Sequence, residues 1–455
     1  MEWGGKRVAL LGLGRSNRGV ARYLSRQGAH LVALDAKSSG QLGDAYRELR
    51  TFSCVEFRLG PDYLDHLRGF DAIFVSPGVK KHIPQLLRAE ADGALVTTEI
   101  AHFLMRCAAP VMGITGSSGK TTTTTLVAQI MEKAWGRPVH LGGNIGTVLI
   151  ERVEDIRADE LVVLELSSFQ LQMVRKSPHW GALINVRPNH LDIHRDYREY
   201  QEAKANIFRF QEPQDYLVFN EDDEVSRRLA QQAPGRTLPF GRLSSKGKGA
   251  RLINGQLAYV NEGGVNRVLA AGDLKLKGLH NVENALAAIA LASLAGVATD
   301  TMAEVLATFR GVEHRLEEVA NHGGVLFVND SIATTPDRTL AALAAMTSPV
   351  LLIAGGYDKH LSFRQLPAAM RGKVRVLLTL GTTAPRIEEE VRRLATNEQP
   401  HVIRCQSLSQ AVMRASQLAQ PGDTVLLSPA CASFDMFGDY EERGHCFKQL
   451  VQSLV

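Results

Sequence analysis

The chain has 455 residues, which predicts about three domains at roughly 150 residues per domain. With 45% hydrophobic and 22% charged residues, the composition is close to the globular average and excludes a disordered, collagen-like or coiled-coil chain. The formal net charge is only +4 and no basic cluster stands out, which argues against a nucleic-acid partner.

The five cysteines are scattered without a CxxC pair, which argues against a disulfide framework and favours a reducing compartment. The N-terminus has too short an apolar run for a signal peptide. The most apolar later stretch, residues 284–298, falls short of the roughly 20 residues that a membrane-spanning helix needs. We therefore expect a cytoplasmic protein without a membrane partner, and we expect a monomer.

The first region, residues 1–107, opens with a strand, a glycine turn, a helical pattern and a second strand, which is typical of a βαβ unit. Gly12 and Gly14 begin a GxGxxG pattern, but Asn17 occupies its third glycine position. Asp35 ends the second strand, where a ribose-binding acid would lie. The pattern predicts a Rossmann-like domain whose turn binds a dinucleotide, binds another phosphate, or is only a tight turn.

The second region, residues 108–311, begins with a short strand at 111–114, followed by a small-residue loop and a helical pattern from Thr121. Two further apolar strands lie at 160–168 and 180–186, and an Ala-rich helix comes near the end of the region. This order predicts a central domain of the P-loop ATPase type with a mostly parallel sheet.

The third region, residues 312–455, has strands at 324–330, 349–356, 374–381 and 423–429, each followed by a polar or helical segment. Alternating strands and helices predict a second Rossmann-like, doubly wound domain. We therefore expect an α/β protein of three domains.

The segment GITGSSGKTT, residues 113–122, is the strongest local signal. A glycine loop lets backbone N–H groups approach phosphate oxygens, and the following helix adds its positive end. A lysine here reaches the β- and γ-phosphates, and the next hydroxyl is a ligand for Mg²⁺. The alternative is a Gly/Ser turn before a Thr-rich helix. The predicted nucleotide contacts are Gly116, Ser117, Ser118, Gly119, Lys120, Thr121 and Thr122.

Nine segments occur in the order in which they are found in the Mur ligases. They are GITGSSGKTT, GGNIG (142–146), LELSSFQL (164–171), NHLDIH (189–194), YQEAKANIF (200–208), GLHNVENALAA (278–288), GVEHRLE (311–317), NDSIATTP (329–336) and SPACASFDMF (428–437). The chain resembles this family nearly end to end, and most of all its members that add glutamate to UDP-N-acetylmuramoyl-L-alanine.

The resemblance implies an ATP-dependent, amide-forming ligase of peptidoglycan precursor synthesis. ATP would phosphorylate the carboxylate of UDP-N-acetylmuramoyl-L-alanine, and the amine of D-glutamate would attack the acyl phosphate. ATP and Mg²⁺ are the implied cofactors, and the two substrates are the implied partners. Cations and Mg²⁺ would offset the repulsion among these anions.

By the same resemblance, Lys120, Glu165, His190 and Lys204 are the catalytic residues. Thr121, Glu165, His190 and Lys204 are the implied metal site. Lys204 would be carbamylated, which converts a cation into an acceptor-only carboxylate. A lone lysine on a helix is otherwise a solvated charge, and a lone histidine is more often structural.

The resemblance places further ATP contacts at Asn281, Asn284, Arg315 and Asp330, although an Asn near a helix start is often only a cap. The implied contacts to the UDP-sugar peptide are Gly14, Arg15, Ser16, Lys37, Ser76, Gly78, Asn144 and Ser167. The implied contacts to glutamate are Thr334, Lys359, Ser433 and Tyr440. Two departures concern the glutamate site, because Ile332 stands where many members have lysine and Tyr440 where Phe is frequent.

Other functions remain open at this stage. An NAD-dependent oxidoreductase would explain the GLGRSN turn and Asp35, but not Lys120, Glu165 and Lys204 together. A nucleotide-binding regulator would lack ligase activity. A folylpolyglutamate synthetase usually begins at the ATP loop, whereas here a whole βαβ region precedes it. The stereochemistry of the glutamate is also open.

Overall fold

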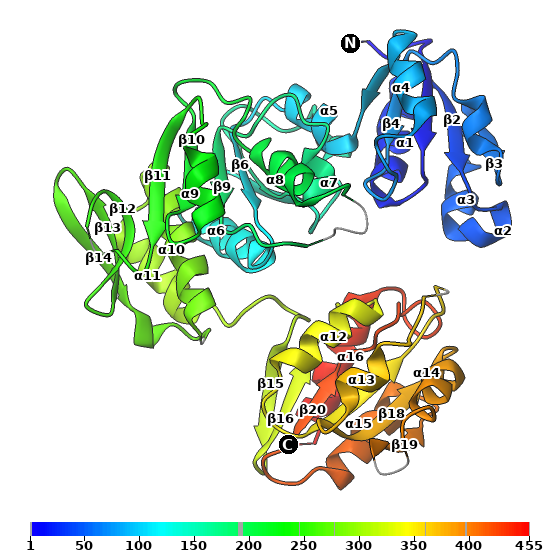
Figure 1. Cartoon of the computed structure of the whole chain (residues 1–455), viewed down its shortest axis with the longest axis vertical. Helices are drawn as coiled ribbons and strands as arrows, with labels where there is room; N and C mark the ends of the chain where they lie inside the picture. Colours follow the sequence, from blue (N-terminus) through cyan, green and yellow to red (C-terminus); the bar gives the residue numbers. More distant parts are fainter. Residues whose placement is uncertain are drawn as a thin grey trace. The chain divides into compact units, whose positions relative to one another are not determined.

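The computed structural model describes residues 2–189, 194–244, 246–276, 278–359, 361–395 and 398–454. The chain divides into two compact units, Met1–Phe309 and Arg310–Val455. The first unit holds a five-stranded and a nine-stranded sheet, and the second holds a six-stranded sheet (Figure 1). The predicted α/β fold, with its three sheet-based regions, is confirmed.

The first sheet is parallel throughout, in the order β3-β2-β1-β4-β5. Its strands are β1 (Arg7–Leu11), β2 (His30–Asp35), β3 (Val55–Leu59), β4 (Ala72–Val75) and β5 (Leu95–Thr97). The helices of this region are α1 (Arg15–Arg26), α2 (Ser39–Leu42), α3 (Asp44–Leu49), η1 (Tyr63–His66), α4 (Pro84–Ala91) and α5 (Glu99–Arg106). The apolar strands β1 and β4 lie at the centre of the sheet, as a doubly wound fold requires.

The second sheet has the order β14-β13-β12-β11-β10-β9-β6-β8-β7, parallel from β7 to β12 and antiparallel at β13 and β14. Its strands are β6 (Val111–Thr115), β7 (Val139–Gly143), β8 (Leu161–Glu165), β9 (Trp180–Leu183), β10 (Tyr216–Asn220), β11 (Arg236–Gly241), β12 (Gly249–Ile253), β13 (Gln256–Asn261) and β14 (Gly264–Ala270). Its helices are α6 (Lys120–Ala134), η2 (Leu149–Arg152), α7 (Ser168–Leu171), α8 (Tyr197–Ala205), α9 (Glu224–Ala230), η3 (Ala271–Asp273), α10 (Leu279–Leu294) and α11 (Thr299–Thr308). The carboxyl ends of β6, β8 and β9 meet at one edge, where such sheets bind ligands.

The third sheet has the order β15-β16-β20-β17-β18-β19, with only β15 antiparallel among the described strands. Its strands are β15 (Glu317–His322), β16 (Val325–Asn329), β17 (Val350–Gly355), β18 (Val374–Leu380), β19 (His401–Arg404) and β20 (Thr424–Leu427). Its helices are α12 (Pro336–Ala345), α13 (Leu366–Met370), α14 (Ala384–Val391), α15 (Leu408–Leu418) and α16 (Tyr440–Gln452). No helix among the described residues is long and apolar enough to cross a membrane.

The first two sheets share one hydrophobic core, which includes Val20 on α1 and Ile150 on η2. At this junction Gly19 lets α1 approach η2 closely, since a Cβ there would lie 2.4 Å from Val148 Cγ1. Arg22 donates two hydrogen bonds to the Glu151 carboxylate, at 2.8 and 2.9 Å. Close packing and a two-bond ion pair therefore join the first region to the second.

This junction yields a stability prediction. Gly19→Ala gains helix propensity but places its Cβ against Val148, so we expect a loss of about 1–3 kcal/mol in the free energy of unfolding. Gly40→Ala is the matched control, because nothing lies within 4 Å of a Cβ at that helical position. It should leave stability unchanged or raise it by up to about 1 kcal/mol. Urea unfolding of the full chain measures both, and equal stability of the two variants would contradict the packing.

Candidate functional site

Residues of two other segments hold the phosphate-loop candidate between β6 and α6. The backbone amides of Ser117 and Ser118 both donate to Asn185 Oδ1, which follows β9, at 2.9 Å. The Ser117 hydroxyl contacts Tyr200 Oη on α8, also at 2.9 Å. Two of the amides predicted to contact phosphate are thus engaged by Asn185, a residue that the sequence analysis did not single out. Direct phosphate contact by these two amides would require Asn185 to release them.

The start of α10 lies directly on this loop. Gly119 has a φ of +78°, and a Cβ there would lie 2.3 Å from Asn284 Oδ1. Asn284 Oδ1 accepts a hydrogen bond from Thr123 Oγ1 at 3.3 Å, and its amide donates to Asn281 Oδ1 at 3.1 Å. The N-cap of α10 is Gly278, so neither asparagine caps the helix. The structure therefore brings both predicted nucleotide-side asparagines to the loop.

Two lysines converge on a single carbonyl oxygen, that of Gly116. Lys120 Nζ donates to it at 3.0 Å and Lys204 Nζ at 2.7 Å, with Thr115 Oγ1 3.3 Å from Lys204. Lys204 is 1% exposed and lies over the Tyr200 ring, 4.8 Å from its centroid. Burial and the Lys120 charge lower the pKa of Lys204 well below its usual range, although Glu165 acts in the opposite direction. The Lys204 amine is therefore biased toward its neutral form.

Glu165 ends β8 and is 1% exposed. Its Oε1 accepts a hydrogen bond from Asn144 Nδ2 at 2.7 Å, and its backbone carbonyl accepts one from the Asn144 amide at 2.8 Å. Its Oε2 is buried and has no hydrogen-bond partner among the described residues. A buried carboxylate oxygen without a partner is costly unless a cation completes it.

The donor set near the loop fits Mg²⁺, which prefers carboxylate and hydroxyl oxygens and keeps several waters. Glu165 supplies the open oxygen, and Thr121 lies in the first turn of α6 with 6% exposure. Lys204 would contribute as a carbamate, because an ammonium group repels a cation and Mg²⁺ prefers oxygen ligands to an amine nitrogen. His190, the remaining predicted ligand, lies outside the described residues.

The two serines after Glu165 have different roles. Ser167 caps α7 through a reciprocal pair of hydrogen bonds with Gln170. Ser168 Oγ contacts His194 Nε2 at 2.9 Å, and the His194 ring stacks on Phe169. Ser167 was predicted to contact the substrate, and its hydroxyl is engaged in capping here. That role remains a prediction.

Asn17 explains the incomplete glycine fingerprint of the first region. Its side-chain amide donates to the carbonyls of Leu11, Gly12 and Phe74 at 3.1, 2.8 and 2.9 Å, and the residue is fully buried. The residue thus ties the ends of β1 and β4 together, where a glycine would leave three carbonyls without this donor. Asp35 accepts hydrogen bonds from two backbone amides, those of Leu13 and Lys37.

Several predicted UDP-side residues come together at the carboxyl end of β1 and β4. A Cβ on Gly14 would lie 3.2 Å from Ser76 Oγ, so the two turns touch. The Ser76 amide donates to the Leu11 carbonyl at 2.9 Å. Arg15 donates to the Gly146 carbonyl in the same loop as Asn144. The remaining predicted contacts on this side are Ser16, at the start of α1, Gly78, two residues after Ser76, and Lys37, whose side chain is exposed.

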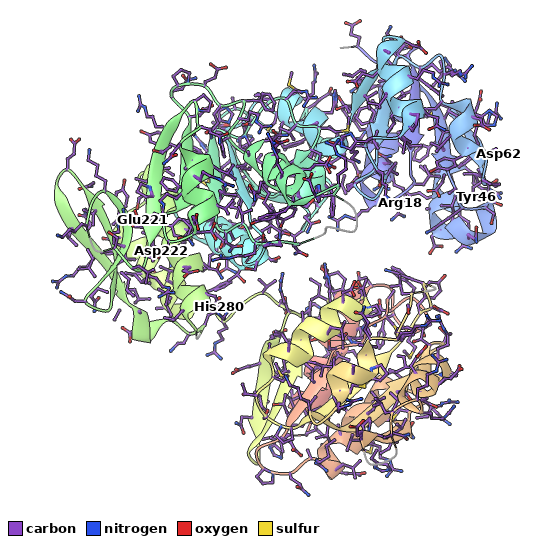
Figure 2. The ribbon with its side chains drawn as sticks, in the orientation of Figure 1. Arg18, Tyr46, Asp62, Glu221, Asp222 and His280 are labelled. Atoms are coloured by element: carbon purple, nitrogen blue, oxygen red, sulfur yellow. The ribbon has the colours of Figure 1, made fainter. Side chains whose placement is uncertain are left out.

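The acidic turn after β10 lies at the nine-stranded sheet, which also carries the phosphate loop. Asp222 Oδ2 accepts a hydrogen bond from the Arg242 amide at 2.7 Å, and Arg242 Nε donates to Glu283 on α10 at 2.8 Å. Figure 2 labels Glu221, Asp222 and His280 on this part of the chain. These contacts join the ends of β10 and β11 to the helix that carries Asn281 and Asn284.

In the second unit, Arg315 lies between two residues with left-handed backbone, His314 at φ +63° and Leu316 at φ +44°. Such conformations are unfavourable for residues with a Cβ and are held only by surrounding contacts. Asp330 Oδ2 accepts a hydrogen bond from Ser428 Oγ at 2.8 Å, and the Leu316 amide donates to its Oδ1 at 3.3 Å. Burial raises the pKa of Asp330 to about 6. The predicted ATP contacts Arg315 and Asp330 are therefore neighbours within this unit.

A fully buried arginine joins segments that carry three of the predicted glutamate contacts. Arg443 on α16 donates to Ser331 Oγ at 2.9 Å, to the Ser331 carbonyl at 2.8 Å and to the Cys431 carbonyl at 3.1 Å. Ser331 Oγ in turn donates to the Tyr440 carbonyl at 2.7 Å. Arg443 thus connects the loop that carries Thr334 and the loop that carries Ser433 to α16, which begins at Tyr440, and no motif in the sequence pointed to it.

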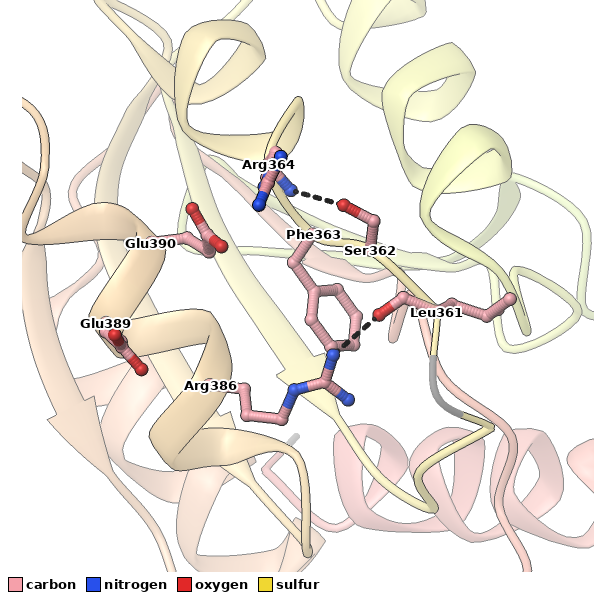
Figure 3. Close-up of a pocket in the computed structure, with 7 residues that line it drawn as sticks. All are labelled: Leu361, Ser362, Phe363, Arg364, Arg386, Glu389 and Glu390. Atoms are coloured by element: carbon pink, nitrogen blue, oxygen red, sulfur yellow. Dashed lines mark hydrogen bonds between the residues drawn. The ribbon is translucent and has the colours of Figure 1, made fainter.

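Lys359 lies on a segment whose neighbouring residues form hydrogen bonds with Arg386. Arg386 on α14 binds both carboxylate oxygens of Asp358 at 2.7 Å and the Leu361 carbonyl at 2.9 Å. Figure 3 shows Arg386 beside Phe363 in a cavity of about 410 Å³. Lys359 Nζ lies 5.8 Å from the Phe434 ring centroid. The Lys359 segment is therefore anchored at residues on both sides of it.

In the second unit, the cation Arg338 lies near Ile332, the position at which the family resemblance implied a lysine. Arg338 on α12 donates to the Ile332 carbonyl at 2.9 Å, and its charge acts on Asp330. Arg338 follows Ile332 by six residues and lies in the first turn of α12. This short separation in the sequence could have indicated Arg338 as a cation near Ile332.

The site has a glycine loop between a buried parallel strand and a helix. Two lysines converge on this loop, and a buried carboxylate with an open oxygen lies beside them. These features are typical of a nucleotide-binding α/β protein of the P-loop class. Three family profiles match the chain. A MurD-like N-terminal domain of Mur ligases matches residues 6–98, the Mur ligase middle domain residues 114–292, and the Mur ligase glutamate ligase domain residues 314–431.

Among curated relatives, the UDP-N-acetylmuramoylalanine--D-glutamate ligase of Symbiobacterium thermophilum is 45% identical over 99% of this chain and 98% of its own length. That of Clostridium tetani is 43% identical over 99% and 97%. The chain belongs to the Mur ligase family.

Solved structures agree on the fold. The UDP-N-acetylmuramate-alanine ligase of Thermotoga maritima has a TM-score of 0.53 at 19% identity, covering 99% of this chain and 100% of that chain. A MurF ligase from the same organism, in complex with ADP, has a TM-score of 0.52 at 18% identity and covers 99% and 96%. At this identity the comparison shows the fold alone.

The role of Asn17 yields a second prediction. Asn17→Gly completes the GxGxxG pattern yet removes the donor to three carbonyls, two of them in buried contacts, so we expect the chain to lose about 2–4 kcal/mol of stability. Asn17→Ala separates the loss of the amide from the lower helix propensity of glycine and should be nearly as unstable. Urea unfolding and calorimetric titration with NAD measure the two effects. A stable Asn17→Gly variant that binds NAD would contradict this role.

Proposed function

We propose that the chain is an ATP-dependent ligase that joins D-glutamate to UDP-N-acetylmuramoyl-L-alanine in the synthesis of peptidoglycan precursors. The names of the relatives, at 40–45% identity over nearly the whole chain, support this substrate pair. The observation that carries the chemistry is the pair of lysines on the Gly116 carbonyl beside the buried Glu165. We also propose that the protein is a monomer and that it acts in the cytoplasm.

The proposal assigns one substrate to each domain. Residues 1–107 would hold the UDP part, residues 108–311 the ATP, and residues 312–455 the glutamate. In this scheme Lys120 compensates the charge of the β- and γ-phosphates, and Asn281 and Asn284 contact the adenine side. Asn144 orients the Glu165 carboxylate, which is hydrogen-bonded to it. Thr334, Lys359, Ser433 and Tyr440 receive the amino acid.

The proposed reaction has two steps. A carboxylate oxygen of UDP-N-acetylmuramoyl-L-alanine attacks the γ-phosphorus of ATP, so that an acyl phosphate forms and ADP leaves. The glutamate amine then attacks the acyl carbon, and the tetrahedral intermediate expels phosphate and loses the amine proton to give the amide. Mg²⁺, when bound, would supply positive charge that offsets the negative charge of the phosphates. The residues contribute mainly position and electrostatic stabilisation.

Lys204 would act in this scheme as a carbamate. Only a neutral amine attacks CO₂, and burial beside Lys120 lowers the pKa of Lys204 in the direction that this addition needs. The amine nitrogen forms a bond to the CO₂ carbon and releases a proton, which leaves an anionic carbamate. That anion would face Lys120 and complete the cation site with Glu165.

A kinetic prediction tests the role of Lys204. Lys204→Ala should lower kcat by at least about 100-fold, because the anion that the carbamate supplies is lost. Added formate or acetate should restore part of the rate, since a small carboxylate can occupy the space vacated. Glu202→Ala, on the exposed face of the same helix, is the matched control and should keep full activity. An active Lys204→Ala variant without added carboxylate would contradict the role.

An amino-acid panel tests the proposed reaction. Phosphate release from ATP should require both UDP-N-acetylmuramoyl-L-alanine and D-glutamate, and omission of either should abolish it. The same assay is run with L-glutamate, other D-amino acids and NAD as controls. Activity with L-glutamate alone, or ATP hydrolysis without the UDP-sugar peptide, would overturn the proposed function.

A further inference from the structure

Glu199 on α8 joins the first region of the chain to the second. Its Oε1 lies 2.5 Å from His82 Nε2, and its Oε2 accepts a hydrogen bond from the Arg195 amide at 2.6 Å. An ionised carboxylate only accepts, so His82 Nε2 is the donor. Although burial opposes its ionisation, the hydrogen bonds from Arg195 and His82 lower the pKa of Glu199. The carboxylate is thus held in its charged form between two segments.

His82 ends a loop that carries two predicted UDP contacts, Ser76 and Gly78. Within this loop, Lys81 Nζ donates to the Ser76 carbonyl at 2.7 Å, and burial lowers the pKa of Lys81 to about 7. A Cβ on Gly12 would lie 3.0 Å from Val79 Cγ2, so the loop packs on the first glycine turn. Residues 76–82 therefore form one folded segment whose far end is attached to Glu199.

The other side of Glu199 leads to the nucleotide loop. The same short helix carries Tyr200, which contacts Ser117, and Lys204, which donates to the Gly116 carbonyl. Just before the helix, His194 Nδ1 lies 3.8 Å from Glu199 Oε2 and His194 Nε2 contacts Ser168. One carboxylate thus connects the UDP-side loop with the helix that packs on the phosphate loop.

The burial pattern separates this contact from an ordinary surface ion pair. The Glu199 side chain is 10% exposed, whereas that of His82 is 49% exposed. On the outer face of the same helix, Arg198 and Glu202 form an ion pair with side chains 86% and 49% exposed. Exposed pairs of that kind contribute little. Loss of His82 would leave the part-buried Glu199 Oε1, among the described residues, with only the exposed Arg195 side chain, whose Nε lies 3.3 Å away, and losing a close donor to a buried charged acceptor is costly.

We propose that Glu199 is a positioning residue that, through His82, holds the 76–82 loop against α8 and so sets the distance between the bound UDP-sugar peptide and the phosphate loop. This inference rests on the proposed function. It assigns Glu199 and His82 no contact with the reacting atoms. Loss of the link should therefore weaken binding of the UDP-sugar peptide and leave ATP binding unchanged.

Steady-state kinetics of the full chain test this role, with His82→Ala, Glu199→Gln, the double variant, and Glu202→Gln as the matched control. His82→Ala and Glu199→Gln should each raise KM for UDP-N-acetylmuramoyl-L-alanine by about 3- to 10-fold, the effect of one partly buried charged hydrogen bond. KM for ATP should stay within about 2-fold. The double variant should be no worse than the poorer single variant, because both remove the same link. Glu202→Gln should match the wild type.

A conservative variant separates position from mere stability. The side-chain amide of Gln places its nitrogen where His82 has Nε2, so His82→Gln should recover most of the wild-type KM. In an active wild-type enzyme, an unchanged KM in His82→Ala, or additive effects in the double variant, would overturn the inference. An inactive wild type would instead overturn the proposed function.

In that case, hydrogen exchange in residues 76–82 tests whether Glu199 and His82 hold this loop against α8. Faster exchange in His82→Ala and Glu199→Gln but not in Glu202→Gln supports it, and equal exchange in all variants overturns it.

Discussion

The site depends on the placement of two ammonium groups against one carbonyl oxygen. Lys120 and Lys204 both donate to Gly116, and Lys204 is almost completely buried. Two like charges at one oxygen repel, and removing one of them from water costs several kcal/mol more. The arrangement is favourable only if one amine is neutral or an anion enters. Under the proposed function, anionic phosphates beside Lys120 and a carbamate on Lys204 would remove this repulsion.

Contacts from several elements of the fold hold the phosphate loop and Glu165 in this arrangement. β6 and β8 are neighbouring parallel strands, so the phosphate loop and Glu165 emerge at the same sheet edge. Asn185 and Tyr200 hold the loop from β9 and α8, and Asn144 holds Glu165 from the end of β7. Because these contacts come from several elements, the loop and the Glu165 carboxylate are fixed at the same sheet edge.

Much of the fold was predictable from the sequence because the buried parallel strands are continuous apolar runs ended by glycine or polar turns. The phosphate loop was predictable for the same reason, since its residues are contiguous. Asn185, Arg443 and the His82–Glu199 contact were not, because each depends on pairing between distant segments; His82 and Glu199 are 117 residues apart. In the sequence, Asn17 stood out only because it occupies the third glycine position of the GxGxxG pattern. Its three bonds to carbonyls required the ends of β1 and β4 to be in place.

The charge state of Lys204 is the central claim, and its pKa is the most direct measurement. NMR of the full chain labelled with ¹³C at the lysine Cε atoms, in CO₂-free buffer so that Lys204 is a free amine, follows each lysine through a pH titration, with Lys204→Arg assigning the signal. The account predicts that Lys204 titrates well below the usual lysine pKa of about 10.4. A Lys204 signal that titrates at or above that value would show an ordinary ammonium group and would contradict the account.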